Sequence, residues 1–293
     1  MTEAHDDPWR YCAERTLQAR ADPRATSDVI SAALAADEDA RWDLVVLLHF
    51  RATLDVLQAA RELCVSECAE ERILGADILG QLGVPDNAFP DESLAALLSM
   101  LDTEQDPDVL GNVCVALGHL HDARAVEKVV PLKDHTDANV RFHLAFALQG
   151  QTDELAVQTL IGLSEDEDSD VRDWATFSLG TQLDEDSPAI REALHKRLTD
   201  SDDTARGEAM LGLARRKDER VVPFLLKELS PEQMGRLEER PDLPLEAAEK
   251  LADARLLPAL LQLRGSGWKD DPLLGKAIES CQSVAKGRAV DSV

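Results

Sequence analysis

The feature that most constrains this sequence is a repeat with a period of about 31 residues. Val109, Val140 and Val171 follow one another at a spacing of 31 residues, and an Ala-Leu pair comes seven residues after Val109 and Val140. A fixed period in the thirties is typical of stacked helical units, because each unit buries its apolar face only against its neighbours. The sequence therefore predicts an all-α fold, an α-solenoid (superhelix) rather than a single globular core.

The repeat continues on both sides of these valines. Arg41 and Arg72 are 31 residues apart, and Arg206 follows Arg172 after 34 residues. Six copies share one register, and the reference position of each copy is the residue before the arginine, or before Leu110 in the third copy. The reference positions are Ala40, Glu71, Val109, Val140, Val171 and Ala205.

The register predicts the domain organisation. We expect about seven stacked helical pairs in residues 1–264, preceded by a capping helix over residues 9–20. We expect a linker, a C-terminal capping helix over residues 272–284 and a frayed tail in residues 265–293. Within this array the Gly- and Pro-rich segments 82–91 and 230–244 break the period and are predicted as loops.

The second helix of each pair, which we term the inner helix, has a clear start signal. In five copies an aspartate lies three residues before the reference position, where its carboxylate can accept hydrogen bonds from the free amides of the first turn. The second copy has Cys68 there and lacks this cap. The capping residues are Asp37, Asp106, Asp137, Asp168 and Asp202.

The first helix of each pair, the outer helix, is recognised by helical spacing of apolar residues. Ser27 is the predicted N-cap of the first one. The predicted outer helices cover residues 27–36, 53–64, 92–101, 123–132, 154–163, 188–198, 220–229 and 255–263.

The charge of the chain limits its partners. With 31 basic and 57 acidic residues, the net charge is −26, which repels nucleic acid and anionic lipid. No apolar run is long enough to cross a bilayer, and the acidic N-terminus does not resemble an export signal. Five scattered cysteines do not form a disulfide framework. We expect a cytoplasmic monomer whose partner, if any, is a basic or neutral protein.

Motifs for catalysis or metal binding are not found in the sequence. There is no Gly-x-Ser-x-Gly elbow, no phosphate-binding glycine loop and no Cys-x-x-Cys pair. Cys64 and Cys68 lie one helical turn apart without a second pair of ligands, and the acidic segment 165–170 lacks the glycine and spacing of an EF-hand. We therefore expect no catalytic residue, no metal and no cofactor.

The recurring Asp-x-x-Val-Arg and Ala-x-Ala-Leu-Gly patterns resemble the HEAT repeat, in particular the bacterial HEAT-like repeat of the phycobilisome-lyase type. The resemblance covers residues 27–263 and implies a solenoid of helical pairs. Proteins of this kind include adaptors, inhibitors, immunity proteins for Rhs-type toxins, deoxyhypusine hydroxylases and DNA glycosylases. The hydroxylases bind iron through His-Glu pairs, and none of the seven histidines here precedes a glutamate. An enzyme similar to a bilin lyase, acting on a small molecule in the groove, stays open as an alternative.

The inner helices also present a candidate binding surface. Steps 4, 5, 7 and 8 after the reference position are small or apolar in nearly every copy and are predicted to pack between layers. Steps 2, 3 and 6, which we term the inner columns, lie on the opposite face, and inner helices line the concave side of such solenoids. The candidate partner-binding residues in the inner columns are Trp42, Asp43, Asp77, Asn112, Phe142, His143, Phe146, Asp173, Trp174, Phe177 and Glu208.

The aromatic residues in the inner columns distinguish a binding surface from simple packing. The chain has 11 aromatic residues, and five of them fall in these columns beside carboxylates. Such pairs are typical of protein interfaces, although rings can instead fill the space between neighbouring helices. Carboxylates would be poor core residues, so we favour binding. The sequence thus predicts a non-catalytic protein-interaction scaffold, in its sharpest form an immunity protein that neutralises a toxin.

Overall fold

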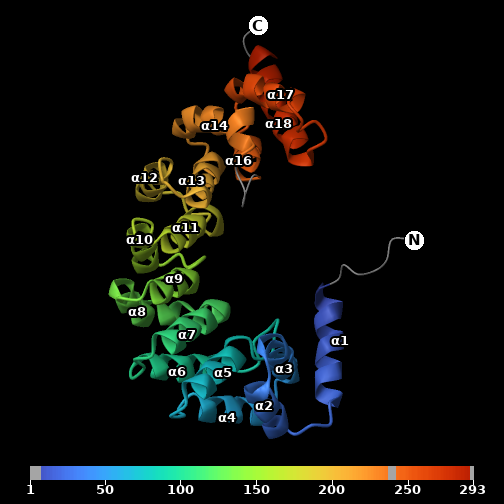
Figure 1. Cartoon of the computed structure of the whole chain (residues 1–293), viewed down its shortest axis with the longest axis vertical. Helices are drawn as coiled ribbons and strands as arrows, with labels where there is room; N and C mark the ends of the chain where they lie inside the picture. Colours follow the sequence, from blue (N-terminus) through green and yellow to red (C-terminus); the bar gives the residue numbers. More distant parts are fainter. Residues whose placement is uncertain (1–7, 237–241, 291–293) are drawn as a thin grey trace, which may run out of the picture. The chain divides into compact units, whose positions relative to one another are not determined.

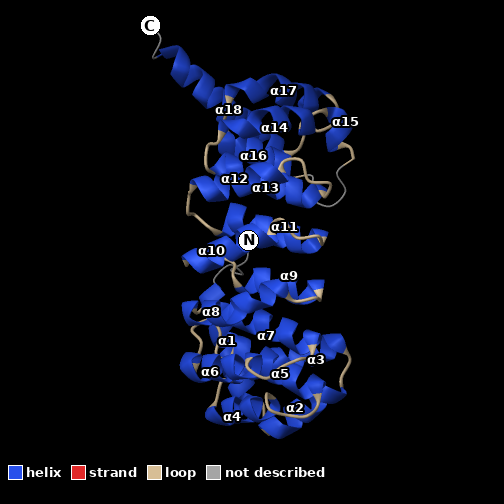
Figure 2. Cartoon of the chain, turned by 90° about the vertical axis from the view of Figure 1, so that its left-hand side faces the viewer, coloured by secondary structure: helices blue, strands red, loops and turns tan. Residues whose placement is uncertain are grey.

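The computed structural model of the chain consists of helices joined by turns (Figure 1). It describes residues 8–236 and 242–290, with the backbone alone for residue 8 and residues 285–290. Figure 2 shows helices and loops but no strand among the described residues. The all-α prediction is confirmed. The chain forms two compact units, Met1–Ala147 and Leu148–Val293, which we describe separately.

In the first unit, four inner helices pack side by side in chain order, and each is backed by an outer helix. The first helix, α1 (Pro8–Ala21), packs on the first inner helix. The inner helices are α3 (Glu38–Arg51), α5 (Ala69–Gly80), α7 (Pro107–Leu120) and α9 (Ala138–Ala147). The outer helices are α2 (Thr26–Ala35), α4 (Leu54–Leu63), α6 (Pro90–Leu101) and α8 (Val126–Val129), the last flanked by 3-10 turns.

The second unit repeats this arrangement. Its inner helices are α11 (Ser169–Phe177), α13 (Asp203–Arg215), α16 (Leu243–Leu251) and α18 (Pro272–Val290), each packed against the next. Its outer helices are α10 (Glu154–Leu163), α12 (Pro188–Arg197), α14 (Val222–Glu228) and α17 (Leu257–Gly265), and a short helix α15 spans Pro231–Met234. The helix predicted over residues 272–284 is therefore an inner helix, packed on both α16 and α17.

The predicted helix starts are confirmed at the inner helices. The Asp37 carboxylate accepts from the Ala40 amide at 3.0 Å, and the Asp168 carboxylate accepts from the Asp170 amide at 3.0 Å. Cys68 makes no side-chain cap, as predicted. The Ser27 cap is wrong, because α2 begins one residue earlier at Thr26, whose hydroxyl donates to a carboxylate on α4.

The core lies between the layers of helices. Leu148 and Leu179, both eight residues after a reference position, are fully buried as predicted. Gly180 and Gly212 let two neighbouring backbones approach, since a Cβ on Gly212 would lie 2.6 Å from the Gly180 Cα. Such contacts explain why small residues recur at these steps.

The two predicted loops have different outcomes. Residues 82–89 are not helical, and α6 begins at Pro90, so the first loop is confirmed. The second is partly wrong, because α15 lies within it and α16 begins at Leu243. Residues 237–241 of this loop lie outside the described residues.

Candidate functional site

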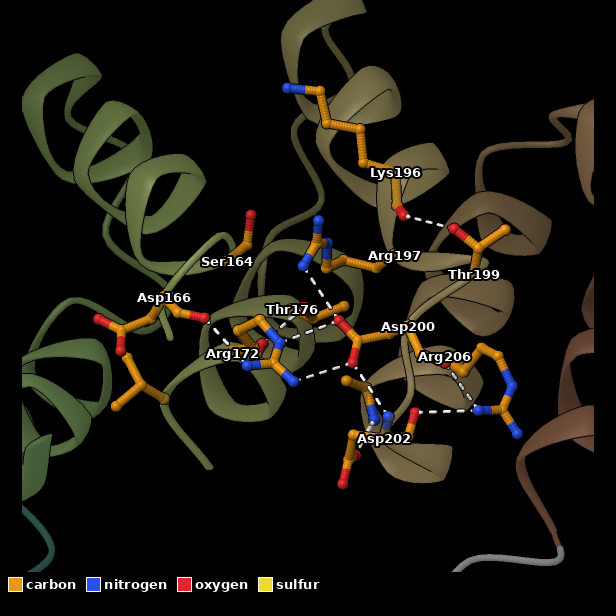
Figure 3. Close-up of polar contacts among 12 residues, drawn as sticks. Ser164, Asp166, Arg172, Thr176, Lys196, Arg197, Thr199, Asp200, Asp202 and Arg206 are labelled. Carbon is orange, nitrogen blue, oxygen red and sulfur yellow. Dashed lines mark hydrogen bonds and ion pairs between the residues drawn. The ribbon is translucent and has the colours of Figure 1, made fainter. Parts of the chain in front are cut away.

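The recurring arginine one residue after the reference position connects consecutive repeats. The Nε and Nη2 atoms of Arg172 on α11 both donate to the Asp200 carboxylate at 3.0 Å. Its Nη1 donates to the carbonyl oxygen of Asp166 at 2.9 Å (Figure 3). The same atom donates to the carbonyl oxygen of Glu167 at 3.0 Å. One guanidinium therefore holds both the turn that precedes its own helix and the turn that precedes α13.

The Asp200 carboxylate in this connection is saturated. It also accepts from Arg197 Nη1 at 3.0 Å and from the Asp202 amide at 3.0 Å (Figure 3). Burial by itself raises the pKa of Asp200, but the hydrogen bonds from Arg172 and Asp202 outweigh burial and hold it below the ordinary value. A buried carboxylate with four donors has a structural role and little capacity for a ligand.

The same connection recurs in the first unit. Arg72 on α5 donates through Nε and Nη2 to the Glu104 carboxylate at 2.7 and 3.1 Å, and through Nη1 to the Ser66 carbonyl at 3.0 Å. Glu104 also accepts from the amides of Gln105 and Asp106, at 3.0 and 2.9 Å. Glu104, Asp166 and Asp200 each lie five residues before a reference position, so the acid recurs in three of the copies.

Arg41 on α3 departs from this rule. Ser66 stands five residues before the reference position of the second copy, where the third and sixth copies have Glu104 and Asp200. Arg41 Nη2 instead donates to the carboxylate of Asp77, in the middle of α5, at 3.2 Å. Burial raises the pKa of Asp77 to about 6, and Arg41 offsets only part of that effect.

Two further side chains complete a cluster around Asp77. His49 is 2% exposed, and its Nε2 lies 2.8 Å from the Asp77 carbonyl oxygen, to which it donates. Burial lowers the pKa of His49 to about 4, so the ring is neutral at pH 7. The rings of His49 and Trp42 stand nearly perpendicular, at 84°, with centroids 6.1 Å apart, and Trp42 itself is 49% exposed. We term Arg41, Trp42, His49 and Asp77 the Trp42 cluster.

The other candidate residues of the first unit are half-buried. Phe142 meets His143 at 5.2 Å between ring centroids, and Phe146 meets His119 at 5.4 Å. The rings of His143 and Phe146 lie against Gly111 and Gly118 of α7, so they fill space between α7 and α9. The Asn112 side chain donates to the Asp108 carbonyl at 2.9 Å within α7.

The candidate residues of the second unit differ among themselves. Asp173, Trp174 and Phe177 are half-buried, and the two rings meet at 5.4 Å with their planes tilted by 54°. Glu208 is 2% exposed, and Thr181 Oγ1 lies 3.3 Å from its carboxylate. Glu208 is therefore an interior residue, unavailable to a partner in this conformation, because α11 and its π-helical end pack over it.

Sequence reasoning missed a second set of structural arginines. Arg216 and Arg51 stand eleven residues after a reference position and are buried. Arg216 donates to carbonyl oxygens of the turn that follows α11, including Leu179 at 2.8 Å and Leu183 at 2.9 Å. Arg51 donates to the carbonyl oxygen of Ala19 at 3.2 Å and ties α1 to α3. The shared eleven-residue step was the signal that could have revealed them.

Three further features of the described part of the chain concern metal binding, membrane crossing and a surface hollow. Among these residues no group of three or more His, Cys, Asp or Glu is placed to hold a metal ion. None of the described helices has both the length and the apolarity needed to cross a membrane. A hollow of about 880 Å³ opens between α4 and α6, with Arg61, Met100 and Gln105 in its wall.

Part of the chain matches a known repeat family, and solved structures share its fold. The family model described as HEAT repeats matches residues 94–180 and 162–233. Among solved structures, the Escherichia coli protein YibA matches with 23% identity over 96% of this chain and 99% of that chain, at a TM-score of 0.71. An engineered protein matches with 19% identity over 92% of this chain and 82% of that one, at a TM-score of 0.50. Importin beta matches with 13% identity over 92% of this chain but 43% of its own length, at a TM-score of 0.52. No curated protein matches the sequence.

Proposed function

Because residues 94–233 match the family model described as HEAT repeats, we propose that this chain is a protein-binding scaffold without catalytic activity. Its inner columns hold a basic or neutral protein partner. The observation that carries the proposal is the exposure of Trp42, which is 49% accessible beside the exposed carboxylate of Asp43. Tryptophan is a frequent hot-spot residue because it buries a large rigid surface, and the cost of leaving it exposed favours a covering partner.

Charge supports a basic partner. A chain with a net charge of −26 attracts a basic protein from a distance and accelerates its encounter, most strongly at low ionic strength. Acidic groups at the edge of an interface act chiefly on the association rate, whereas buried rings act on the dissociation rate. In this proposal Asp43 accelerates association, and Trp42 slows dissociation once the partner covers it.

In its sharper form, the proposal is that the chain is an immunity protein that neutralises a cognate toxin. This form rests on the resemblance to bacterial HEAT-like immunity proteins of Rhs-type toxins and on charge, since nuclease toxins that bind phosphate backbones tend to be basic. An acidic inner surface would cover such a toxin by electrostatic complementarity.

The test uses the full chain, immobilised, to capture partners from the organism's own lysate at low and at physiological ionic strength. Mass spectrometry identifies the captured proteins, and affinity is then measured with the purified partner. We expect Trp42→Ala to weaken binding by about 2 kcal/mol or more, with little change in thermal stability. Asp43→Lys should slow association and reduce its dependence on salt.

Variants of the second unit show how far the interface extends. Trp174 is half-buried against Phe177, so Trp174→Ala tests whether the inner columns of that unit take part. Equal recovery of the same partners by Trp42→Ala, Asp43→Lys and Trp174→Ala would remove the inner columns from the interface. Capture of no basic or neutral protein under either condition would contradict the proposed function itself.

A further inference from the structure

The carboxylate of the Arg41–Asp77 pair accepts fewer hydrogen bonds than the carboxylates of the two equivalent pairs. Asp200 and Glu104 each accept four hydrogen bonds, two from the repeat arginine and two from other donors. Within the described residues, the Asp77 carboxylate accepts a single one, from Arg41 at 3.2 Å. An ionised carboxylate has about four acceptor directions, and the Asp77 side chain is 16% exposed, so Asp77 keeps acceptor capacity that Arg41 does not use.

We propose that Asp77, together with Trp42, which His49 links to it, is the binding site for a guanidinium or ammonium group of the protein partner. The inference rests on the proposed function and names the side chain that the inner surface recognises, an arginine or lysine. The cation forms a charge-assisted hydrogen bond with the Asp77 carboxylate and lies against the Trp42 ring. The exposed Asp43 on the same helix adds attraction at the rim.

His49 fixes the geometry of this site. Its Nε2 donates to the Asp77 backbone carbonyl, and its ring meets the Trp42 ring edge to face. One neutral imidazole thus holds the tryptophan of α3 next to the carboxylate-bearing turn of α5. Because the imidazole bonds to the backbone and carries no charge at pH 7, it does not compete with an incoming cation for the Asp77 carboxylate.

Arg41 has a second carboxylate to turn to when a cation arrives. Glu70 at the start of α5 has a lowered pKa, first because the Cys68 thiol donates to it, and in part because of the nearby Arg41 charge. The Arg41 guanidinium is held by one contact and is partly exposed, unlike the buried bidentate pair of Arg172. It can therefore leave Asp77 for Glu70 without losing a carboxylate partner.

A titration with N-acetyl-arginine amide tests the site directly. Nuclear magnetic resonance follows the Trp42 indole, assigned with Trp42→Phe, and the Asp77 side-chain carboxyl at pH 8, where this carboxyl is ionised. We expect saturable shifts of both signals. Asp77→Asn and Trp42→Ala should each weaken binding roughly tenfold, and N-acetyl-citrulline amide, an uncharged analogue, should not bind.

Two further variants sharpen the result. Arg41→Ala should strengthen binding of the arginine probe severalfold, since it removes the cation that competes for Asp77. Asp184→Asn is the matched control, because the Asp184 side chain is 99% exposed in the second unit, and its affinity should equal that of the wild type. Circular dichroism confirms that each variant is folded.

The outcomes separate this inference from the proposed function. No shift at Trp42 or Asp77 on addition of the probe, or equal binding by Asp77→Asn and wild type, overturns the cation site. If a protein partner nevertheless binds the inner columns, the proposed function stands while the inference fails. If the probe binds specifically but no protein partner is captured, the cation site stands while the proposed function fails.

Discussion

Arg41 and Arg172 occupy the same place in their inner helices but pair with different kinds of carboxylate. Arg172 is held by bidentate contact to a buried, saturated carboxylate and by two carbonyl oxygens of its own turn. Arg41 makes one contact to a carboxylate whose pKa burial raises to about 6. The neighbouring rings differ in the same direction, because Trp174 is half-buried whereas Trp42 is exposed.

This difference shows how a repeat becomes specialised. The turn acid that should receive Arg41 is replaced by Ser66, so the arginine turns to Asp77 on the inner surface. The α11 region keeps the contact between the repeat arginine and the turn acid, and this contact between Arg172 and Asp200 stabilises the fold. The α3 region loses that link, and it retains an unsaturated carboxylate and an exposed ring that His49 connects, which is the combination proposed above for binding a cation.

The largest expected effect should be the same in both regions, because it concerns the core beneath them. Leu48 and Leu179 both stand eight residues after a reference position and are fully buried. Leu48→Asp and Leu179→Asp each place an unpaired charge between layers and should cost more than about 4 kcal/mol, enough to unfold the unit. Circular dichroism melting curves check this, and an unchanged curve would show that the register is wrong.

The arginines should separate the two regions. Arg172→Ala leaves the nearly buried Asp200 without its main counter-charge and should lower the free energy of unfolding by about 3 kcal/mol. Arg41→Ala should cost only about 1 kcal/mol, because one contact joins the pair and Asp77, whose pKa burial already raises to about 6, can take up a proton when its counter-charge is removed. Denaturant titration of both variants measures the difference. Equal losses would mean that the two pairs are equivalent.

Protonation should act on the α3 region through His49. Its pKa is lowered from 6.5 to about 4, so the unfolded chain takes up a proton that the folded protein refuses, and stability is lost as pH falls from about 6.5 to 4. His49→Gln removes this penalty and should retain about 2 kcal/mol more of its stability than wild type between pH 6.5 and 4.5. Protonation of Asp77, whose pKa is raised to about 6, stabilises the folded state as pH falls over a similar range. Wild type and His49→Gln share this effect, so the difference between them reports His49. Identical pH profiles would contradict the assignment.

The smallest effect concerns the helix starts. Cys68 and Asp168 have almost the same backbone conformation, with φ of −83° in both, but only Asp168 caps its helix. Asp168→Ala should lower the free energy of unfolding by about 1 kcal/mol, and Cys68→Asp should raise it by a similar amount. Parallel denaturant midpoints test both changes. A Cys68→Asp variant no more stable than wild type would show that α5 does not need the missing cap.

The sequence by itself determined the repeat architecture. Periodic aspartates, arginines and leucines act over one or two helical turns, so their spacing predicted the inner helices, their caps and the buried steps that contain Leu148 and Leu179. Local capping and periodic burial depend on neighbours close in the chain, which a sequence displays directly.

Only the tertiary structure decided which inner-column residues are accessible. Trp42, Trp174 and Glu208 belong to the same columns, yet one is exposed, one half-buried and one interior. Their exposure depends on what the next helix places over each position, and the choice of Asp77 by Arg41 depends on a serine 25 residues away in the chain. Packing between repeats sets these contacts, and one-dimensional spacing does not record it.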